Sequence, residues 1–249
     1  MIPVTSIELP AHSVMRTNQG RNLTFSLVES LGQAIVTGAY DKTPFPTEAE
    51  LSEHYSVSRS ATREAVKMLT AKGLLRARQR QGTQVEPESR WNLFDPDVLR
   101  WMLERKFSLR LLCEFAEMRL AIEPTAASLA AAKALPADID AIAAGLERMR
   151  AAERGEDDPL MADIDFHLAI LRASRNPFYR QLQDMVNTAL RISIRFTNQV
   201  QGQGATLSDH ERVYEAIAGR DPERARAAMH KLANDVLLLI REHSTASLP

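Results

Sequence analysis

Cysteine is almost absent from this sequence, with Cys113 the single one among 249 residues. A lone thiol excludes a disulfide framework and every zinc or iron–sulfur site built from several thiolates. The sequence also lacks an apolar run of the roughly 18 to 20 residues that a membrane helix needs. No basic segment followed by an apolar one, the pattern of a secretory signal, opens the chain. We therefore expect a protein of the reducing cytoplasm with no membrane partner.

Glycine and proline are also scarce, at 10 and 12 residues, while 45% of the residues are hydrophobic and 25% are charged. This composition is typical of a mainly helical globular protein. A length of 249 residues favours two domains. We predict a flexible tail over residues 1–22, a first domain over 23–87, a linker over 88–95 and a second domain over 96–245.

Basic residues gather in one segment, although the net charge is only −1. From Tyr55 to Gly82 there are seven Lys or Arg residues and one acidic residue, Glu64. Such a density is typical of a surface that contacts nucleic-acid phosphates. Charge by itself leaves a second interpretation open, and indeed favours it, in which these residues form a solvated helix face.

The first domain has the element order of a winged helix-turn-helix. Thr47 and Glu50 form a capping-box pattern at the start of a short helix. Ser58 has the properties of an N-cap for the next helix, which Gly73 ends. The predicted elements are helices over 23–38, 47–54 and 58–73, followed by strands over 74–78 and 83–86.

The third of these helices carries the residues expected to read DNA, because the second helix of a helix-turn-helix motif enters the major groove. Arg59 and Arg63 are four positions apart, so both guanidinium groups lie on one face and suit bidentate binding of guanine. We expect neighbouring serines to contact phosphates, and the basic wing to follow the backbone or reach the minor groove. The predicted DNA-binding residues are Ser58, Arg59, Ser60, Arg63, Arg78, Arg80 and Gly82.

The second domain predicts helices only, with proline at the start of several of them. Short connections favour an antiparallel bundle of six to seven helices. The predicted fold class is therefore mainly α, a winged helix-turn-helix followed by a helical bundle. The predicted helices span 96–104, 109–134, 136–154, 160–172, 177–201, 207–218 and 222–242.

Three histidines of the predicted bundle, His167, His210 and His230, are candidate metal ligands. Asp163 precedes His167 by four residues, a spacing at which a carboxylate and an imidazole reach one ion from one helix face. Imidazole and carboxylate without thiolate suit zinc, nickel, manganese or iron. The residues alone leave a second interpretation open, in which each histidine makes an ordinary contact in or near the core.

Five short segments of the first domain match a known family pattern: FPTEAELS at 45–52, VSRS at 57–60, REA at 63–65, GLL at 73–75 and QGT at 81–83. Through them the first domain resembles the GntR family of repressors. The resemblance implies that Arg59 and Arg63 read bases and that Gly82 permits a close approach of the wing backbone. Many members carry arginine where this chain has Ala49, so we expect one DNA contact fewer from the second helix.

Five segments of the second domain also match a known pattern: RLAIEP at 119–124, DIDFH at 163–167, NP at 176–177, SDH at 208–210 and AMHKL at 228–232. Through them the second domain resembles the metal-binding effector domain of the FadR-type subgroup of that family. The resemblance implies a divalent ion, most simply zinc with nickel or manganese as alternatives. Its implied ligands are Asp163, His167, His210 and His230.

An acid bound to such an ion would favour a second cation, and Arg119 lies in an apolar helical run where a charge needs a partner. Its spacing also allows pairing with Glu117 or Glu123 on an exposed face. The resemblance favours binding of an effector, with Thr188 and Arg191 as further candidates.

The segment WNLFDPDVLRW at 91–101 is similar to the opening of the effector domain in galactonate-responsive repressors. We therefore predict a homodimeric transcription regulator that binds a palindromic operator and releases it when a sugar acid binds, with residues 87–91 as the hinge. A metal-dependent enzyme and a direct metal sensor are the alternatives. We expect no catalytic residues, because no motif places a further base near the ligands and an enzyme would not need the Arg59 helix.

Overall fold

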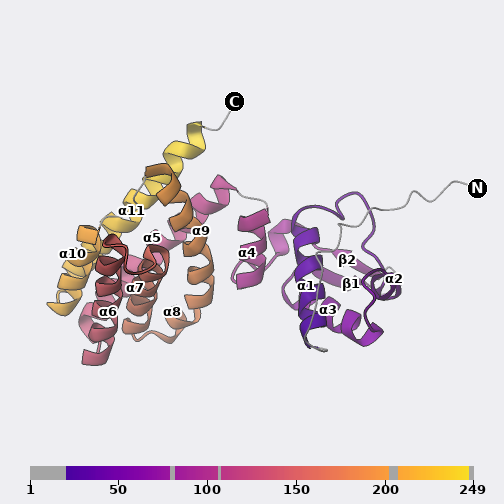
Figure 1. Cartoon of the computed structure of the whole chain (residues 1–249), viewed down its shortest axis with the longest axis horizontal. Helices are drawn as coiled ribbons and strands as arrows, with labels where there is room; N and C mark the ends of the chain where they lie inside the picture. The colour runs from indigo at the N-terminus through magenta and orange to yellow at the C-terminus, as the bar shows by residue number, and fades with distance from the viewer. Residues whose placement is uncertain (1–20, 79–81, 106–107, 202–206, 247–249) are drawn as a thin grey trace, which may run out of the picture. The chain divides into compact units, whose positions relative to one another are not determined.

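The computed structural model describes residues 21–78, 82–105, 108–201 and 207–246 (Figure 1). The chain divides into two compact units, Met1–Lys106 and Phe107–Pro249, and each is described by itself. No helix in the described ranges is both long enough and apolar enough to cross a membrane.

The first unit contains the predicted winged helix-turn-helix, and the ends of its elements agree with the prediction to within two residues. Its strands are antiparallel, with Leu75 opposite Val85 and Arg78 opposite Gly82. Leucines from all the helices and from the first strand contribute much of the core, such as Leu31, Leu51 and Leu69. The elements are α1 (Arg21–Val36), α2 (Glu48–His54), α3 (Arg59–Ala71), β1 (Leu75–Arg78) and β2 (Gly82–Val85).

Local side-chain bonds start the two helices of the helix-turn-helix motif. At α2 the Thr47 hydroxyl accepts from the Glu50 amide at 3.3 Å, and the Thr47 amide donates to the Glu50 carboxylate at 2.8 Å. At α3 the Ser58 hydroxyl accepts from the Ala61 amide at 3.1 Å. Both N-caps are therefore confirmed, and they fix where α3 begins.

Helix α4 (Pro96–Arg105) belongs to the first unit, although the sequence placed it in the second domain. The segment expected as a linker folds back on the winged helix-turn-helix through a short 3-10 turn, Glu88–Arg90. The Trp91 indole donates to the Glu86 carbonyl at 2.8 Å, and the Asn92 amide donates to the Lys72 carbonyl at 3.1 Å. These bonds tie the expected hinge to the first unit.

Ion pairs and one buried indole hold α4 and the residue before it against α1 and the end of α3. The Lys72 ammonium lies 2.9 Å from Asp95 and 2.8 Å from Asp97. Arg100 donates to both carboxylate oxygens of Glu29, at 2.9 and 2.7 Å. Trp101 is 1% exposed beneath these charges, so α4 completes the core of the first unit.

Gly32 on α1 leaves the space that the Trp101 ring fills. A Cβ at this position would lie 2.3 Å from the ring, and the buried indole has little room to move. Gly32→Ala should therefore lower the unfolding free energy of the protein by about 1–3 kcal/mol, the usual cost of overpacking, although alanine normally stabilises a helix relative to glycine.

Thermal and urea unfolding of Gly32→Ala measures this effect. Trp101→Leu supplies the control, because a smaller side chain makes room for the new methyl group. The double variant should then be less destabilised than the sum of the single variants. A strictly additive result would contradict this packing.

The second unit is a bundle of helices gathered around α5 (Figure 1). Helices α5 and α11 form its largest packing contact, and α6 packs along α7. The prediction of one helix over 177–201 was wrong in detail, because the helix is interrupted at Leu182. The Leu182 amide donates to the Tyr179 carbonyl in a tighter turn. The elements are α5 (Leu109–Lys133), α6 (Pro136–Glu153), α7 (Pro159–Ala173), α8 (Pro177–Gln181), α9 (Gln183–Gln201), α10 (Leu207–Ala218) and α11 (Pro222–Ala246).

A close approach between α6 and α7 fixes the position of the α7 backbone that carries His167. A Cβ on Gly145 of α6 would lie 3.0 Å from the Cα atom of Phe166 on α7. Phe166 is fully buried and precedes His167. The backbone that carries His167 is thus held against its neighbour without an intervening side chain.

Candidate metal centre and DNA-contacting helix

Two helices bring three potential ligands of one ion together. On α7, Asp163 and His167 lie one turn apart, and His210 stands in the first turn of α10. The Oδ1 atom of Asp163 lies 3.2 Å from Nε2 of His167 and 3.6 Å from Nε2 of His210. All three ligand atoms lie within 4.8 Å of one another.

This arrangement fits a divalent cation. Two atoms that each lie about 2.1 Å from an ion are roughly 3.0 to 3.4 Å apart in octahedral or tetrahedral coordination. The Oδ1 atom of Asp163 is buried, and among the described residues no N–H group donates to it with hydrogen-bond geometry. Burial of such an oxygen is costly unless a cation or donor satisfies it. The donor set of one carboxylate and two imidazoles suits zinc, nickel or manganese.

A buried ion pair lies directly behind the ligands. Arg119 and Glu123 of α5 are 3% and 2% exposed. Arg119 donates to Glu123 from Nε at 2.6 Å and from Nη2 at 3.1 Å. Glu123 in turn lies 2.9 Å from Nδ1 of His167, which leaves Nε2 of that imidazole to face the ion. Arg119 Nη2 is 3.5 Å from the same Nε2 atom.

Sequence reasoning missed the part that Glu123 plays. It considered the Arg119–Glu123 pair only on an exposed face, whereas the structure buries the pair against His167. The apolar residues around both positions were the signal that could have shown this, because a helix face rich in apolar residues packs against the core together with its charged members.

The ionisable groups of the cluster shift one another's pKa values. Burial alone would raise the pKa of Asp163, but His167 and His210 outweigh it and hold that pKa well below its usual range. Burial likewise opposes ionisation of Glu123, but Arg119 and His167 lower its pKa to about 2. Burial would lower the pKa of His167, but Glu123 and Asp163 raise it to about 9. The metal-free cluster therefore holds an imidazolium between two carboxylates.

Metal uptake should depend steeply on pH. Since the pKa of His167 is raised to about 9, its Nε2 atom must lose a proton before it can bind an ion. Lowering the pH from 8 to 6 should weaken zinc binding by about a hundredfold, tenfold per unit for one proton. Asp163 is already ionised in this range and releases none.

Calorimetric titration of zinc at pH 7 in two buffers of different ionisation enthalpy counts the released protons. We expect about one from His167 per ion. Release of no proton, with affinity independent of pH, would contradict the charge state described above.

His230 does not join the cluster, contrary to the prediction from the sequence. Its side chain is exposed on α11, while Met229, Leu232 and Ala233 are buried. A helix that buries these three positions turns position 230 toward solvent. The apolar residues at intervals of three and four in this segment were the signal that could have shown it.

The predicted effector residues of α9 are engaged within their own helix. The Thr188 hydroxyl donates to the Asp184 carbonyl at 2.9 Å. The Arg191 guanidinium donates to the Asn187 side chain at 3.2 Å. Of the three predicted effector residues, Arg119 alone has a hydrogen bond or ion contact with the ligand group in the described structure.

The predicted DNA-reading residues stand at the start of α3. Ser58, Arg59 and Ser60 are exposed there. The side chain of Arg63 is 65% exposed, with a single long contact of 3.4 Å to Glu48. Gly82 has a φ of +77° and open space around its missing side chain. Arg80 and the side chain of Arg78 lie outside the described residues.

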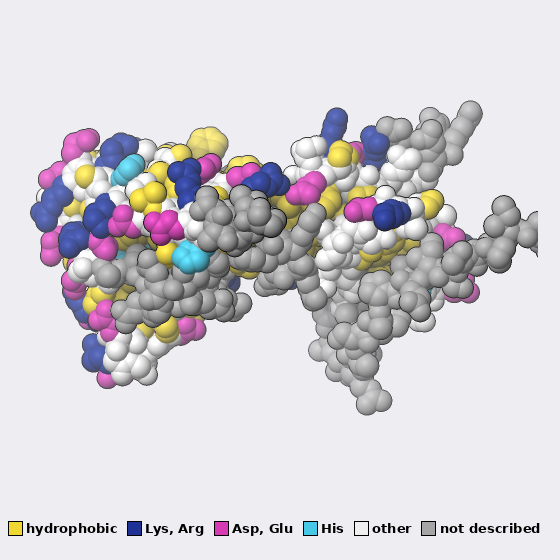
Figure 2. All heavy atoms as spheres, turned by 90° about the horizontal axis from the view of Figure 1, so that it is seen from above, with side chains coloured by type: hydrophobic (Ala, Val, Ile, Leu, Met, Phe, Trp, Pro, Cys, Tyr) yellow, Lys and Arg dark blue, Asp and Glu magenta, His cyan; other side chains and the backbone are white. Residues whose placement is uncertain are grey.

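Acidic and basic side chains are intermixed on the face of the second unit that Figure 2 shows. The basic segment from Tyr55 to Gly82, which the charge distribution of the sequence singled out, belongs to the first unit.

Comparison with known proteins identifies both units. Residues 24–85 match the family model of bacterial regulatory proteins of the gntR family, and residues 114–235 match the FCD domain. The galactonate operon transcriptional repressor of Escherichia coli (strain K12) is 34% identical over 210 residues, which cover 83% of this chain and 92% of that protein. The chain belongs to the GntR family. This GntR-family chain is a transcriptional regulator with a DNA-binding unit and a helical FCD unit, and the predicted fold class is confirmed.

Further relatives agree with this assignment. The uncharacterised HTH-type transcriptional regulator YieP of Escherichia coli (strain K12) is 33% identical, over 85% of this chain and 93% of that protein. A solved structure of Lar, which controls the expression of the Listeria monocytogenes agr system, has a TM-score of 0.54 at 18% identity and covers 90% of this chain and 99% of that chain. The structural likeness concerns the fold.

Proposed function

We propose that this GntR-family regulator represses a sugar-acid operon. It dissociates from its operator DNA when a sugar acid binds to an ion held by Asp163, His167 and His210. The observation that carries the proposal is the position of Arg119. A buried guanidinium stands 3.5 Å from a ligand atom of the cluster, so an anion placed on the ion would meet a second positive group. A bound cation supplies open positions that attract carboxylate oxygens.

The chemistry of the cluster supports an acid as the effector. Three protein ligands leave positions free on a zinc, nickel or manganese ion that takes more than three ligands. Arg119 would orient the carboxylate, while Glu123 holds both Arg119 and His167 in place. A sugar acid is the class we favour, since the name of the E. coli relative refers to galactonate.

On the DNA side, a homodimer would place two α3 helices in successive major grooves of a palindromic, double-stranded operator. Arg59 and Arg63 would bind guanines, and Ser58 and Ser60 would approach phosphates. The wing residues Arg78, Arg80 and Gly82 would follow the DNA backbone.

The test of the proposed function uses the zinc-loaded protein and the DNA upstream of its gene. Fluorescence anisotropy measures operator affinity with and without galactonate, before and after chelation of the metal. We expect galactonate to weaken operator binding only while the metal is present. Release by zinc alone would support a metal sensor instead, and conversion of galactonate by the protein would support an enzyme.

Arg59→Ala should weaken operator binding by about tenfold to a hundredfold, because a bidentate arginine–guanine pair contributes roughly 1–3 kcal/mol. Lys67→Ala is the matched control, since Lys67 is an exposed cation of the same helix beside Glu64. It removes the same charge but should cost much less specific affinity. Equal losses for the two variants on specific and unrelated DNA would show that Arg59 supplies charge only.

A further inference from the structure

Ser193 is a buried hydroxyl group that nothing described so far explains. It is 1% exposed in the middle of α9, and among the described residues its Oγ atom has no hydrogen-bond partner. Serine and threonine in a helix commonly donate to the carbonyl four residues earlier, as Thr188 does on the same helix. A buried hydroxyl without a partner is costly and calls for an explanation, such as a ligand.

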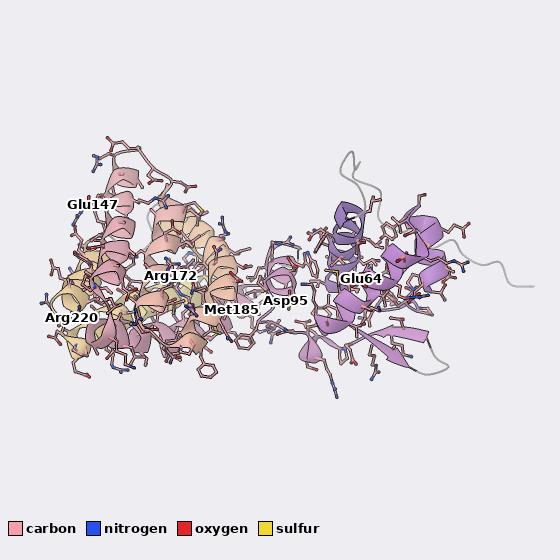
Figure 3. The ribbon with its side chains drawn as sticks, turned by 90° about the horizontal axis from the view of Figure 1, so that it is seen from below. Glu64, Asp95, Glu147, Arg172, Met185 and Arg220 are labelled. Carbon is pink, nitrogen blue, oxygen red and sulfur yellow. The ribbon has the colours of Figure 1, made fainter. Side chains whose placement is uncertain are left out.

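The hairpin formed by α7, α8 and α9 places Ser193 level with Asp163. The two long helices adjoin at the end where α7 stops at Ala173 and α9 starts at Gln183, and Arg172 donates to the Gln183 side chain there. Figure 3 labels Arg172 and Met185 near this end. Asp163 lies ten residues before Ala173 and Ser193 ten residues after Gln183. Each is therefore about 15 Å from the shared end at 1.5 Å per residue.

The face of α9 that carries Ser193 is the face packed into the bundle. Its neighbours on that face are Met185, Val186, Ala189, Leu190 and Ile194, all buried. Helix α9 packs chiefly on α7 and also touches α5. Helix α7 carries Asp163 and His167, and helix α5 carries Arg119 and Glu123. Thr188, by contrast, is five residues away and so points to a different side of α9.

We propose that the Ser193 hydroxyl is a recognition group for the effector and hydrogen-bonds an oxygen of the acid that is bound at the ion. This inference rests on the proposed function. A hydroxyl both donates and accepts, so it suits the hydroxyl groups of a sugar acid, which do the same. A site that satisfies a buried polar group through the ligand discriminates against an analogue that lacks the matching oxygen. Ser193 therefore favours a hydroxylated acid over a plain carboxylate of equal charge.

The test compares wild-type protein with Ser193→Ala, using the full chain loaded with zinc and titrated with galactonate in a calorimeter. The variant should bind galactonate at least about tenfold more weakly, since it loses a hydrogen bond to a polar or charged partner. Its zinc stoichiometry should not change. Its melting temperature without acid should rise by about 2–4 °C, because a buried hydroxyl without a partner is removed.

Ser174→Ala is the matched control, because it removes a buried hydroxyl that already donates to the Leu171 carbonyl, and it should leave galactonate affinity unchanged. Ser193→Ala that binds galactonate as the wild type does would overturn this inference and leave the proposed function intact. A variant that loses stability or zinc would show a structural role and also overturn it. Wild-type protein that binds zinc but no galactonate would overturn the proposed function together with this inference.

Discussion

Replacement of His167 by alanine should remove tight zinc binding, whereas replacement of His230 by alanine should leave it unchanged. His167 supplies one of three converging ligand atoms, and His230 is exposed on α11. Loss of a group that only orients a ligand already costs tenfold to a hundredfold in metal affinity. Loss of the ligand itself should therefore cost more than about a hundredfold.

Zinc content after purification and competition with a chelator of known affinity measure this difference. Chelation should lower the melting temperature of the wild-type protein and of His230→Ala, because a bound ion stabilises the folded state. It should not change the melting temperature of His167→Ala, which holds no ion to remove. Because the two variants remove the same side chain from the same unit, a general effect of losing histidine would appear in both. Loss of zinc from His230→Ala would contradict the three-ligand cluster and favour the four-ligand set expected from the sequence.

Arg119→Ala should lower the unfolding free energy of the metal-free protein by about 3–5 kcal/mol. Glu123 would remain ionised and buried after its main partner is gone, which is the costly way to break a buried ion pair. Urea unfolding in the presence of a chelator, followed by circular dichroism, measures the shift of the midpoint.

Arg110→Ala is the matched control on the same helix. Arg110 also pairs with a glutamate four residues later, Glu114, but at 3.3 Å on an exposed surface. Its loss should change stability by less than about 1 kcal/mol. Replacing both members of the buried pair by apolar residues, Arg119→Met with Glu123→Leu, should restore most of the lost stability. Equal effects of Arg119→Ala and Arg110→Ala would show that burial of the pair is unimportant.

The DNA-contacting role of α3 and the pairing of Asp163 with His167 at an ion are proposals that rest on local sequence patterns. The basic helix with Arg59 and Arg63 is exposed where the sequence placed it, because capping by Ser58 fixes the start of α3 locally. Asp163 and His167 were predicted as a pair for the same reason, since an interval of four on one helix is a local property. His210 joined them from a distant helix only through the resemblance.

Features that depend on near neighbours along the chain could be predicted from the order of the residues. These features are the helices and their caps, the wing strands, the pairing of Asp163 with His167, and the family, because caps, turns and apolar periodicity act over a few residues. The packing of distant helices, which no local pattern contains, decided that α4 belongs to the first unit, where Gly32 leaves room for Trp101. It also decided that Arg119 and Glu123 are buried together and that His230 faces solvent. The physical reason is that burial and partners are set by which helix faces meet, and a face can be assigned only once its neighbours are known.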